Sequence, residues 1–335
     1  MLAWALLGGG AGCTSLPMPP LPATCSDVST LFLVDDALAD AAHPCHAWVD
    51  ETHGRVARSS SASAVVWSLR TSAGTGLLVS ATHTLGVGYF DPASGDVAEA
   101  LVDPAEETGV PRIFLVEPDG TGVDADATPL FRLYNPAIPD DENTNGFQDI
   151  LPVHDFYFGV VDDQKVASDL IVGTPDPLHA APPAVYDPAG RTATAPTYTS
   201  ADAGDLVLLV GFPAASPFAG RQSAGVGRVL SDAEAEAAIV DLAAVGDVEG
   251  DIAYRADVEM IIRGYASGGM SGGGVFDEGG RLVGVIVRAS DPLGGMQYVR
   301  AVRMSYAVQE LTNAFAALPA EEKAAVAPYV SPEVP

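Results

Sequence analysis

The strongest chemical signal in the sequence is a glycine-rich loop around one serine. Residues 269–273 read Gly-Met-Ser-Gly-Gly, with Ser271 at the centre. A serine nucleophile needs a tight turn that exposes its hydroxyl, and glycines let backbone N–H groups point at the oxyanion that develops on the substrate. The loop therefore predicts a serine nucleophile. The alternative is a glycine-rich hairpin that only happens to contain serine.

The segments around this loop favour the nucleophile. A β-type run at Val275–Phe276 follows it, then a turn at Gly279-Gly280, then a second run at Leu282–Val287. Two upstream runs, Gly204–Pro213 and Gly225–Val229, are also predicted strands. Loop, hairpin and upstream strands together resemble the nucleophile-bearing half of a trypsin-like serine protease.

This resemblance implies roles for individual residues. The N–H groups of Gly269 and Ser271 would form an oxyanion hole. The binding partner or substrate of the whole protein would be a protein or peptide. Met270 stands where trypsin has an aspartate that receives a freed amino terminus. Activation by that route is therefore not expected.

The resemblance also implies a histidine, at the end of a motif of the type G-[ST]-G-F-L-V-[ST]-x-x-x-V-L-T-A-x-H. Residues 74–90 read Gly-Thr-Gly-Leu-Leu-Val-Ser-Ala-Thr-His-Thr-Leu-Gly-Val-Gly-Tyr-Phe. Aligned from the glycine pair without a gap, they place Tyr89 at the histidine position and His83 six residues too early. A tyrosine hydroxyl, with a pKa near 10, is a poor general base. The histidines that could replace the missing one are His43, His46, His53, His154 and His179.

Two aspartates compete for the third catalytic position. In this family the aspartate heads a strand of the type D-[IL]-A-[LI]-[VL]-x-[LV]. Asp155–Val161 fits that shape and is the preferred candidate, while Asp169–Val172 is the alternative.

A second motif, at Asp141–Asp149, has the form D-x-[DN]-x-[DN]-G-x-x-D. It resembles EF-hand-like and thrombospondin-type calcium loops, in which alternate oxygen-bearing residues wrap a hard cation. The expected ligands of a structural Ca²⁺ are side-chain oxygens and one backbone carbonyl, from Asp141, Asn143, Asn145, Asp149 and Phe147. The alternative is a surface turn rich in Asp and Asn.

Composition indicates an all-β fold, because 35 glycines and 26 prolines separate many short β-type runs. The resemblance implies two six-stranded antiparallel β-barrels. Apolar spacing predicts a short N-terminal helix at Ser29–Ala42 and a C-terminal helix at Ser305–Ala317. A further helix is predicted at Ala233–Ala243.

The predicted organisation has five parts. Residues 1–24 form a signal or lipoprotein segment with a Pro-rich tether, and 25–64 form a helical extension that ends in a Ser-rich linker at 58–64. Residues 65–200 form the first barrel with insertions, 201–320 the second barrel with the C-terminal helix, and 321–335 a tail.

Charge and cysteine content limit the partners and the compartment. The formal net charge of −28 excludes nucleic acid and anionic membrane surfaces as partners. Residues 1–12 are apolar and precede Cys13, which resembles a bacterial lipoprotein signal, so we expect export and membrane contact only through a lipid on Cys13. Cys25 and Cys45 are then expected to form a disulfide.

These patterns predict an exported serine protease homologue without an activating histidine. Such a protein would be an inactive binding or scaffold module with no catalytic cofactor. One alternative is an active serine endopeptidase that uses Ser271 with a histidine placed elsewhere. Another is a calcium-stabilised surface binding protein.

Overall fold

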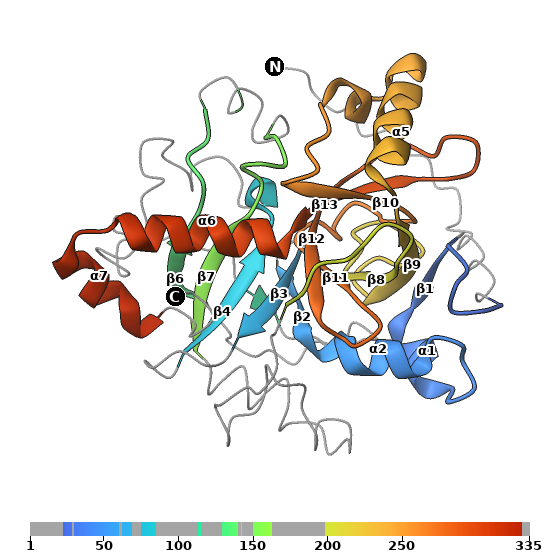
Figure 1. The fold of residues 1–335 in the computed structure, drawn as a ribbon. Helices are drawn as coiled ribbons and strands as arrows, with labels where there is room; N and C mark the ends of the chain where they lie inside the picture. Colours follow the sequence, from blue (N-terminus) through green and yellow to red (C-terminus); the bar gives the residue numbers. More distant parts are fainter. Residues whose placement is uncertain are drawn as a thin grey trace, which may run out of the picture.

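The chain folds into two antiparallel β-sheets that pack side by side, with helices on the outside (Figure 1). The computed structural model describes residues 23–28, 30–59, 62–68, 75–84, 113–114, 129–139, 142, 150–162 and 198–329. One apolar cluster runs through both sheets, with Val65 and Leu77 from the first and Val210 and Val285 from the second. The two sheets therefore share a core, and burial of these side chains stabilises the junction between them.

The second sheet closes into a six-stranded barrel. Its strands are β8 (Leu206–Gly211), β9 (Ser223–Val229), β10 (Glu259–Arg263), β11 (Gly274–Phe276), β12 (Leu282–Ala289) and β13 (Tyr298–Arg303). Strand β8 pairs with both β9 and β11, which closes the order β9-β10-β13-β12-β11-β8. A seventh strand, β1 (Leu31–Leu33), adds to the outside edge of β9.

The first sheet also has six strands, in the order β5-β2-β3-β4-β7-β6. They are β2 (Val56–Ser59), β3 (Ala62–Ser68), β4 (Thr75–Ser80), β5 (Ile113–Phe114), β6 (Pro129–Tyr134) and β7 (Tyr157–Asp162). Every pairing in it is antiparallel. The predicted fold class, all-β with two six-stranded antiparallel β-barrels, is confirmed, with one barrel closed and the other present as a six-stranded sheet among the described residues.

The Ser-rich run predicted as a linker is instead the β2–β3 hairpin, with Ser59 opposite Ala62. Its small residues serve close packing, because Ala62, Ser63 and Ala64 are all buried. A high content of serine and alanine is typical of a flexible linker. In this hairpin the same small side chains instead let β3 pack closely against the second barrel.

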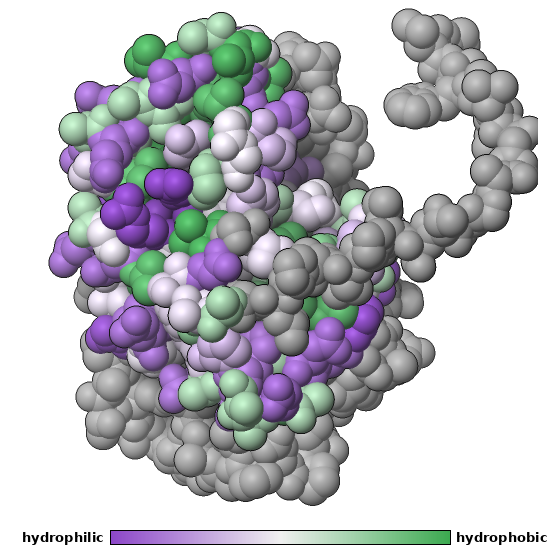
Figure 2. All heavy atoms as spheres, turned by 90° about the vertical axis from the view of Figure 1, so that its right-hand side faces the viewer, coloured by the Kyte–Doolittle hydropathy of each residue, from purple (hydrophilic) through white to green (hydrophobic). Residues whose placement is uncertain are grey.

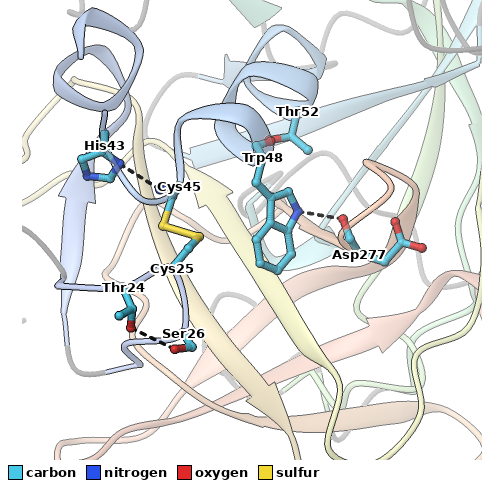
Figure 3. The surroundings of a disulfide bond; sticks show 8 residues. All are labelled: Thr24, Cys25, Ser26, His43, Cys45, Trp48, Thr52 and Asp277. Atoms are coloured by element: carbon cyan, nitrogen blue, oxygen red, sulfur yellow. Dashed lines mark hydrogen bonds between the residues drawn. A yellow bond between two sulfur atoms is a disulfide. The ribbon is translucent and has the colours of Figure 1, made fainter. Parts of the chain in front are cut away.

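The N-terminal segment also differs from the predicted helix. Residues 31–33 are strand β1, and the chain then forms α1 (Val34–Ala39), α2 (His46–Thr52) and the 3₁₀ turn η1 (His53–Arg55). The predicted disulfide joins Cys25 to Cys45 (Figure 3). Beside it, Trp48 Nε1 donates a hydrogen bond of 2.7 Å to the carbonyl of Asp277, which fixes α2 against the β11–β12 turn.

Both other predicted helices are present. Helix α5 (Asp232–Val245) begins with a capping box between Ser231 and Glu234 and is followed by the 3₁₀ turn η6 (Val248–Asp251). Helix α6 (Met304–Ala317) buries Met304, Ala307, Val308 and Leu311 at helical spacing and runs across both sheets (Figure 1). Part of the predicted tail forms α7 (Ala320–Val326) and the turn η7 (Ala327–Tyr329).

The surface seen from the side of β1 and α5 is a mixture of polar and apolar side chains, and apolar ones gather toward the α5 end (Figure 2). Exposed valines there are Val240, Val245 and Val248. Within the described residues, no helix combines the length and the apolar character that crossing a membrane requires.

Candidate active site

The site begins with a histidine and an aspartate brought together by strand pairing. Strand β4 ends at Ser80, and the 3₁₀ turn η2 (Thr82–Thr84) follows. Because β4 and β7 are antiparallel with Ser80 opposite Tyr157, the residues just after β4 lie beside those just before β7. His83 Nδ1 lies 2.8 Å from Asp155 Oδ2, and the His83 backbone N–H donates to Asp155 Oδ1 at 2.9 Å.

The gap-free alignment placed His83 six residues before the position of the family's histidine. The contact with Asp155 shows that this placement is wrong. The gap-free alignment matched β4 to the first strand of the family motif, but β4 corresponds to its last strand. Residues 78–83 read Leu-Val-Ser-Ala-Thr-His, which match the closing V-L-T-A-x-H. The proposed substitute, Tyr89, lies outside the described residues, as does Asp169.

Burial and charge make this pair suitable for proton transfer. Asp155 is fully buried, whereas the His83 side chain is 26% exposed. Burial disfavours the charged form of His83, but the charge and hydrogen bond of Asp155 outweigh it. The pKa of His83 is therefore raised above its ordinary 6.5. Asp155 also fixes the ring, since an Nδ1–H that donates to the carboxylate leaves Nε2 free to accept a proton.

The nucleophile loop connects β10 to β11 through two successive tight turns. Met270 N–H donates to Ser267 O at 2.9 Å, and Gly273 N–H donates to Met270 O at 2.8 Å. Gly269 and Gly272 take positive φ angles of +97° and +80°, which glycine adopts without the strain that a side chain would add.

The first sheet holds this loop through Ser63 of β3. The Ser63 backbone N–H donates to Ser271 O at 2.9 Å, and Ser63 Oγ donates to Gly269 O at 2.8 Å. Ser80 Oγ in turn donates to Ser63 O at 2.8 Å. Since Ser80 ends β4 just before His83, the serine loop meets the first sheet beside the histidine and aspartate.

The backbone N–H groups of Gly269 and Ser271 have no hydrogen-bond acceptor within the described residues. Nor does a hydrogen bond join Ser271 Oγ to the His83 ring in that part of the chain. Catalytic hydrogen bonds of this type are often long in the absence of substrate and tighten when it binds.

The side chain of Met270 packs into the core of the second barrel and so holds the Ser271 loop. This side chain is fully buried in an apolar cluster that includes Leu31 and Leu33 of β1 and Leu209 of β8. A Cβ on Gly211 would approach Met270 Cα to 3.0 Å, so the backbone packs closely at this point. Apolar packing thus holds the residue before the nucleophile.

The remaining histidines of the described segments have other partners. His46 Nδ1 contacts Ala37 O, His53 Nδ1 contacts Val49 O, and His43 Nδ1 accepts from Cys45 N–H. His154 Nδ1 lies 2.8 Å from Glu142 Oε2, away from Asp155. His179 lies outside the described residues.

The predicted calcium ligands Asp141, Asn143, Asn145, Phe147 and Asp149 also lie outside the described residues, as does Cys13. Within the segments that are described, no group of three or more His, Cys, Asp or Glu side chains is arranged to hold a metal ion.

Gly272→Ala is expected to disable the loop. A Cβ at this position would lie 2.1 Å from both Ser63 O and Ser80 Oγ, and the φ of +80° adds strain. Because the substitution displaces Ser271 and its N–H group from the first sheet, we expect labelling of Ser271 by a fluorophosphonate to slow at least about 10²-fold.

The matched control is Gly279→Ala, in the β11–β12 turn, where the nearest atom to a new Cβ is 3.4 Å away. Equal labelling rates for the two folded variants would contradict the role assigned to Gly272.

The closed six-stranded barrel and the second six-stranded antiparallel sheet, which share a core, agree with the trypsin-like two-barrel fold that the sequence predicts. No protein-family model and no curated protein matches the chain.

Solved serine protease structures are similar to the chain at low identity. The Rv3671c protease from M. tuberculosis in its inactive form is 14% identical with a TM-score of 0.39, covering 82% of this chain and 96% of that one. The thermostable protease AL20 from an extremophilic microorganism is 15% identical with a TM-score of 0.38, covering 76% and 91%. A Glu endopeptidase in complex with MPD is 12% identical with a TM-score of 0.39, covering 78% and 89%.

Proposed function

We propose that the protein is an active serine endopeptidase with Ser271 as nucleophile, His83 as general base and acid, and Asp155 as the residue that orients His83. The observation that carries the proposal is the pair of hydrogen bonds between His83 and Asp155, at the place where the Ser271 loop meets the first sheet. The expectation of an inactive binding module depended on the absence of a histidine near Ser271. Because His83 lies beside Asp155 at this junction, that expectation loses its basis.

The proposed reaction follows from these positions. Ser271 Oγ attacks the carbonyl carbon of the scissile peptide bond while His83 Nε2 takes its proton. The N–H groups of Gly269 and Ser271 donate to the oxyanion. His83 then gives the proton to the leaving amine, the C–N bond breaks, and an ester to Ser271 remains. Water, deprotonated by His83, hydrolyses the ester and restores the serine.

The disulfide supports an extracytoplasmic setting for this activity. A bond between Cys25 and Cys45 persists in oxidising compartments and is rare in the cytosol. We therefore keep export as part of the proposal, with a protein or peptide as the substrate.

The experiment that tests the proposal is labelling of the purified protein with a fluorophosphonate probe, which reacts with activated serines. Rapid labelling of the wild type that disappears in Ser271→Ala would support it. A folded wild-type protein that does not label would reject it.

The rate of labelling should depend on pH through His83. Only neutral imidazole can accept the proton of Ser271, so activity is lost as pH falls through the pKa of His83. Because that pKa is raised, we expect half of the rate to be lost at a pH above 6.5. A rate profile of labelling or of kcat/KM for a peptide substrate measures this midpoint. A midpoint at or below 6.5 would contradict the assignment.

A further inference from the structure

A buried row of alternating charges lies in the second barrel. Arg288 of β12 contacts Glu249 of η6 at 2.8 Å, Glu249 contacts Arg300 of β13 at 3.1 Å, and Arg300 contacts Glu259 of β10 at 2.7 Å. Arg300 and Glu259 are each 1% exposed at the side chain. Burying such charges costs desolvation energy that their attraction only partly recovers, so the row is weak evidence for a purely stabilising role.

Arg288 ends this row at the junction of the two sheets. Its Nη1 donates to the carbonyl of Ile150 at 3.4 Å. Ile150 begins the segment that leads to Asp155, and this segment is turned by hydrogen bonds from His154 N–H to Leu151 O and from Asp155 N–H to Pro152 O. A side chain of the second barrel thus contacts the segment that carries the aspartate of the first sheet.

The strand that carries Arg288 also holds the nucleophile loop. Gly272 N–H donates to Ile286 O at 2.7 Å, and Ile286 N–H donates to Gly273 O at 2.9 Å. Ile286 and Arg288 lie on the same short stretch of β12. The backbone of β12 therefore fixes Ser271, and its arginine reaches toward Asp155.

The charges at the end of the row also act on His83. Besides burial and Asp155, the groups that influence the pKa of His83 are Arg288, which lowers it, and Glu249, which raises it. The guanidinium of Arg288 is therefore near enough to the imidazole for its removal to be detected there.

We propose that Arg288, held by Glu249, is a positioning residue that fixes the Asp155 segment relative to the Ser271 loop. This proposal rests on the proposed function. Serine and imidazole come from different sheets, and a displacement of about 1 Å between reacting groups can cost about 10²-fold in rate. A brace between β12 and the Asp155 segment limits that displacement.

The test compares Arg288→Met and Arg288→Lys with the wild type in fluorophosphonate labelling across pH. The matched control is Arg281→Met, which removes an exposed arginine of the same hairpin, paired with Asp277. We expect Arg288→Met to label at least about tenfold more slowly at its plateau. Its midpoint should move to higher pH, because a cation near His83 is lost.

Lysine keeps the charge but not the planar fork of donors. Arg288→Lys should therefore retain the wild-type midpoint and recover little of the plateau rate, while Arg281→Met labels like the wild type. A folded Arg288→Met with wild-type rate and midpoint would overturn the proposal. If Arg288→Met does not fold, wild-type rates in Arg288→Lys would overturn it.

A second measurement tests the role of Arg288 independently of whether the protein is an active protease. NMR titration of His83, with its Nδ1–H proton signal, needs no reactive serine. If the wild type fails to label, the proposed function is rejected. The positioning role then stands only if Arg288→Met changes the Nδ1–H signal and raises the titration midpoint, and an unchanged spectrum rejects it as well.

Discussion

His83→Ala is expected to lower kcat for peptide hydrolysis by about 10⁴- to 10⁶-fold. Without the imidazole, Ser271 has no group to take its proton, and the leaving amine has none to supply one. The backbone donors at Gly269 and Ser271 would retain the rest of the rate enhancement. Thermal unfolding of the variant, followed in parallel, shows whether the fold is intact.

Two further substitutions make this result specific to His83. His46→Ala removes an imidazole that contacts Ala37 O in the N-terminal segment, and the rate should stay near that of the wild type. Tyr89→Phe changes the residue that the gap-free alignment placed at the histidine position, and the rate should again stay near that of the wild type. A large loss in Tyr89→Phe together with an active His83→Ala would contradict the site described above.

Asp155→Asn is expected to lower kcat by about 10⁴-fold, although the side chains have nearly the same shape. Asp155 accepts from both the ring and the backbone of His83. An asparagine NH₂ directed at Nδ1 would require the other tautomer, whose Nε2 carries a hydrogen and cannot accept the proton of Ser271. Kinetics with a peptide substrate measure the loss.

The same substitution should move the pH midpoint in a defined direction. The negative charge and hydrogen bond of Asp155 raise the pKa of His83, so their loss lets burial dominate and shifts the midpoint to lower pH. The control is Glu142→Gln, which alters a second carboxylate–imidazole contact of 2.8 Å, to His154. It should reduce the rate far less, and equal losses in the two variants would contradict the catalytic role of Asp155.

Local patterns were sufficient to predict the backbone of the Ser271 loop and many of the strands. The glycines around Ser271 predict a tight turn because few other residues adopt positive φ, and the structure places Gly269 and Gly272 at such angles. Short β-type runs bounded by turn residues predicted four strands of the second barrel, β8, β9, β11 and β12. The Cys25–Cys45 disulfide and the position of Asp155 at the head of β7 follow from equally local signals.

The partner of Asp155 is where sequence reasoning failed. Both β3 and β4 are short apolar strands, and a glycine pair, Gly74 and Gly76, occurs only at the start of β4, so the gap-free alignment is one strand out of register. Strand pairing resolves this ambiguity, because Ser80 opposite Tyr157 brings His83 to Asp155 across a separation that no local pattern spans. A comparison of Leu78–His83 with the end of the motif, rather than its beginning, would have found the histidine.

The sequence alone thus determined the all-β class, the tight glycine turn around Ser271 and the disulfide, because backbone conformation and the periodicity of burial depend on neighbouring residues. Only the tertiary structure decided that His83 meets Asp155, that Ser63 of a presumed linker holds the Ser271 loop, and that Arg288 reaches Ile150. Each of these contacts joins segments far apart in the chain. Their formation depends on which strands pair and how the two sheets pack, and neither is encoded in any single stretch of sequence.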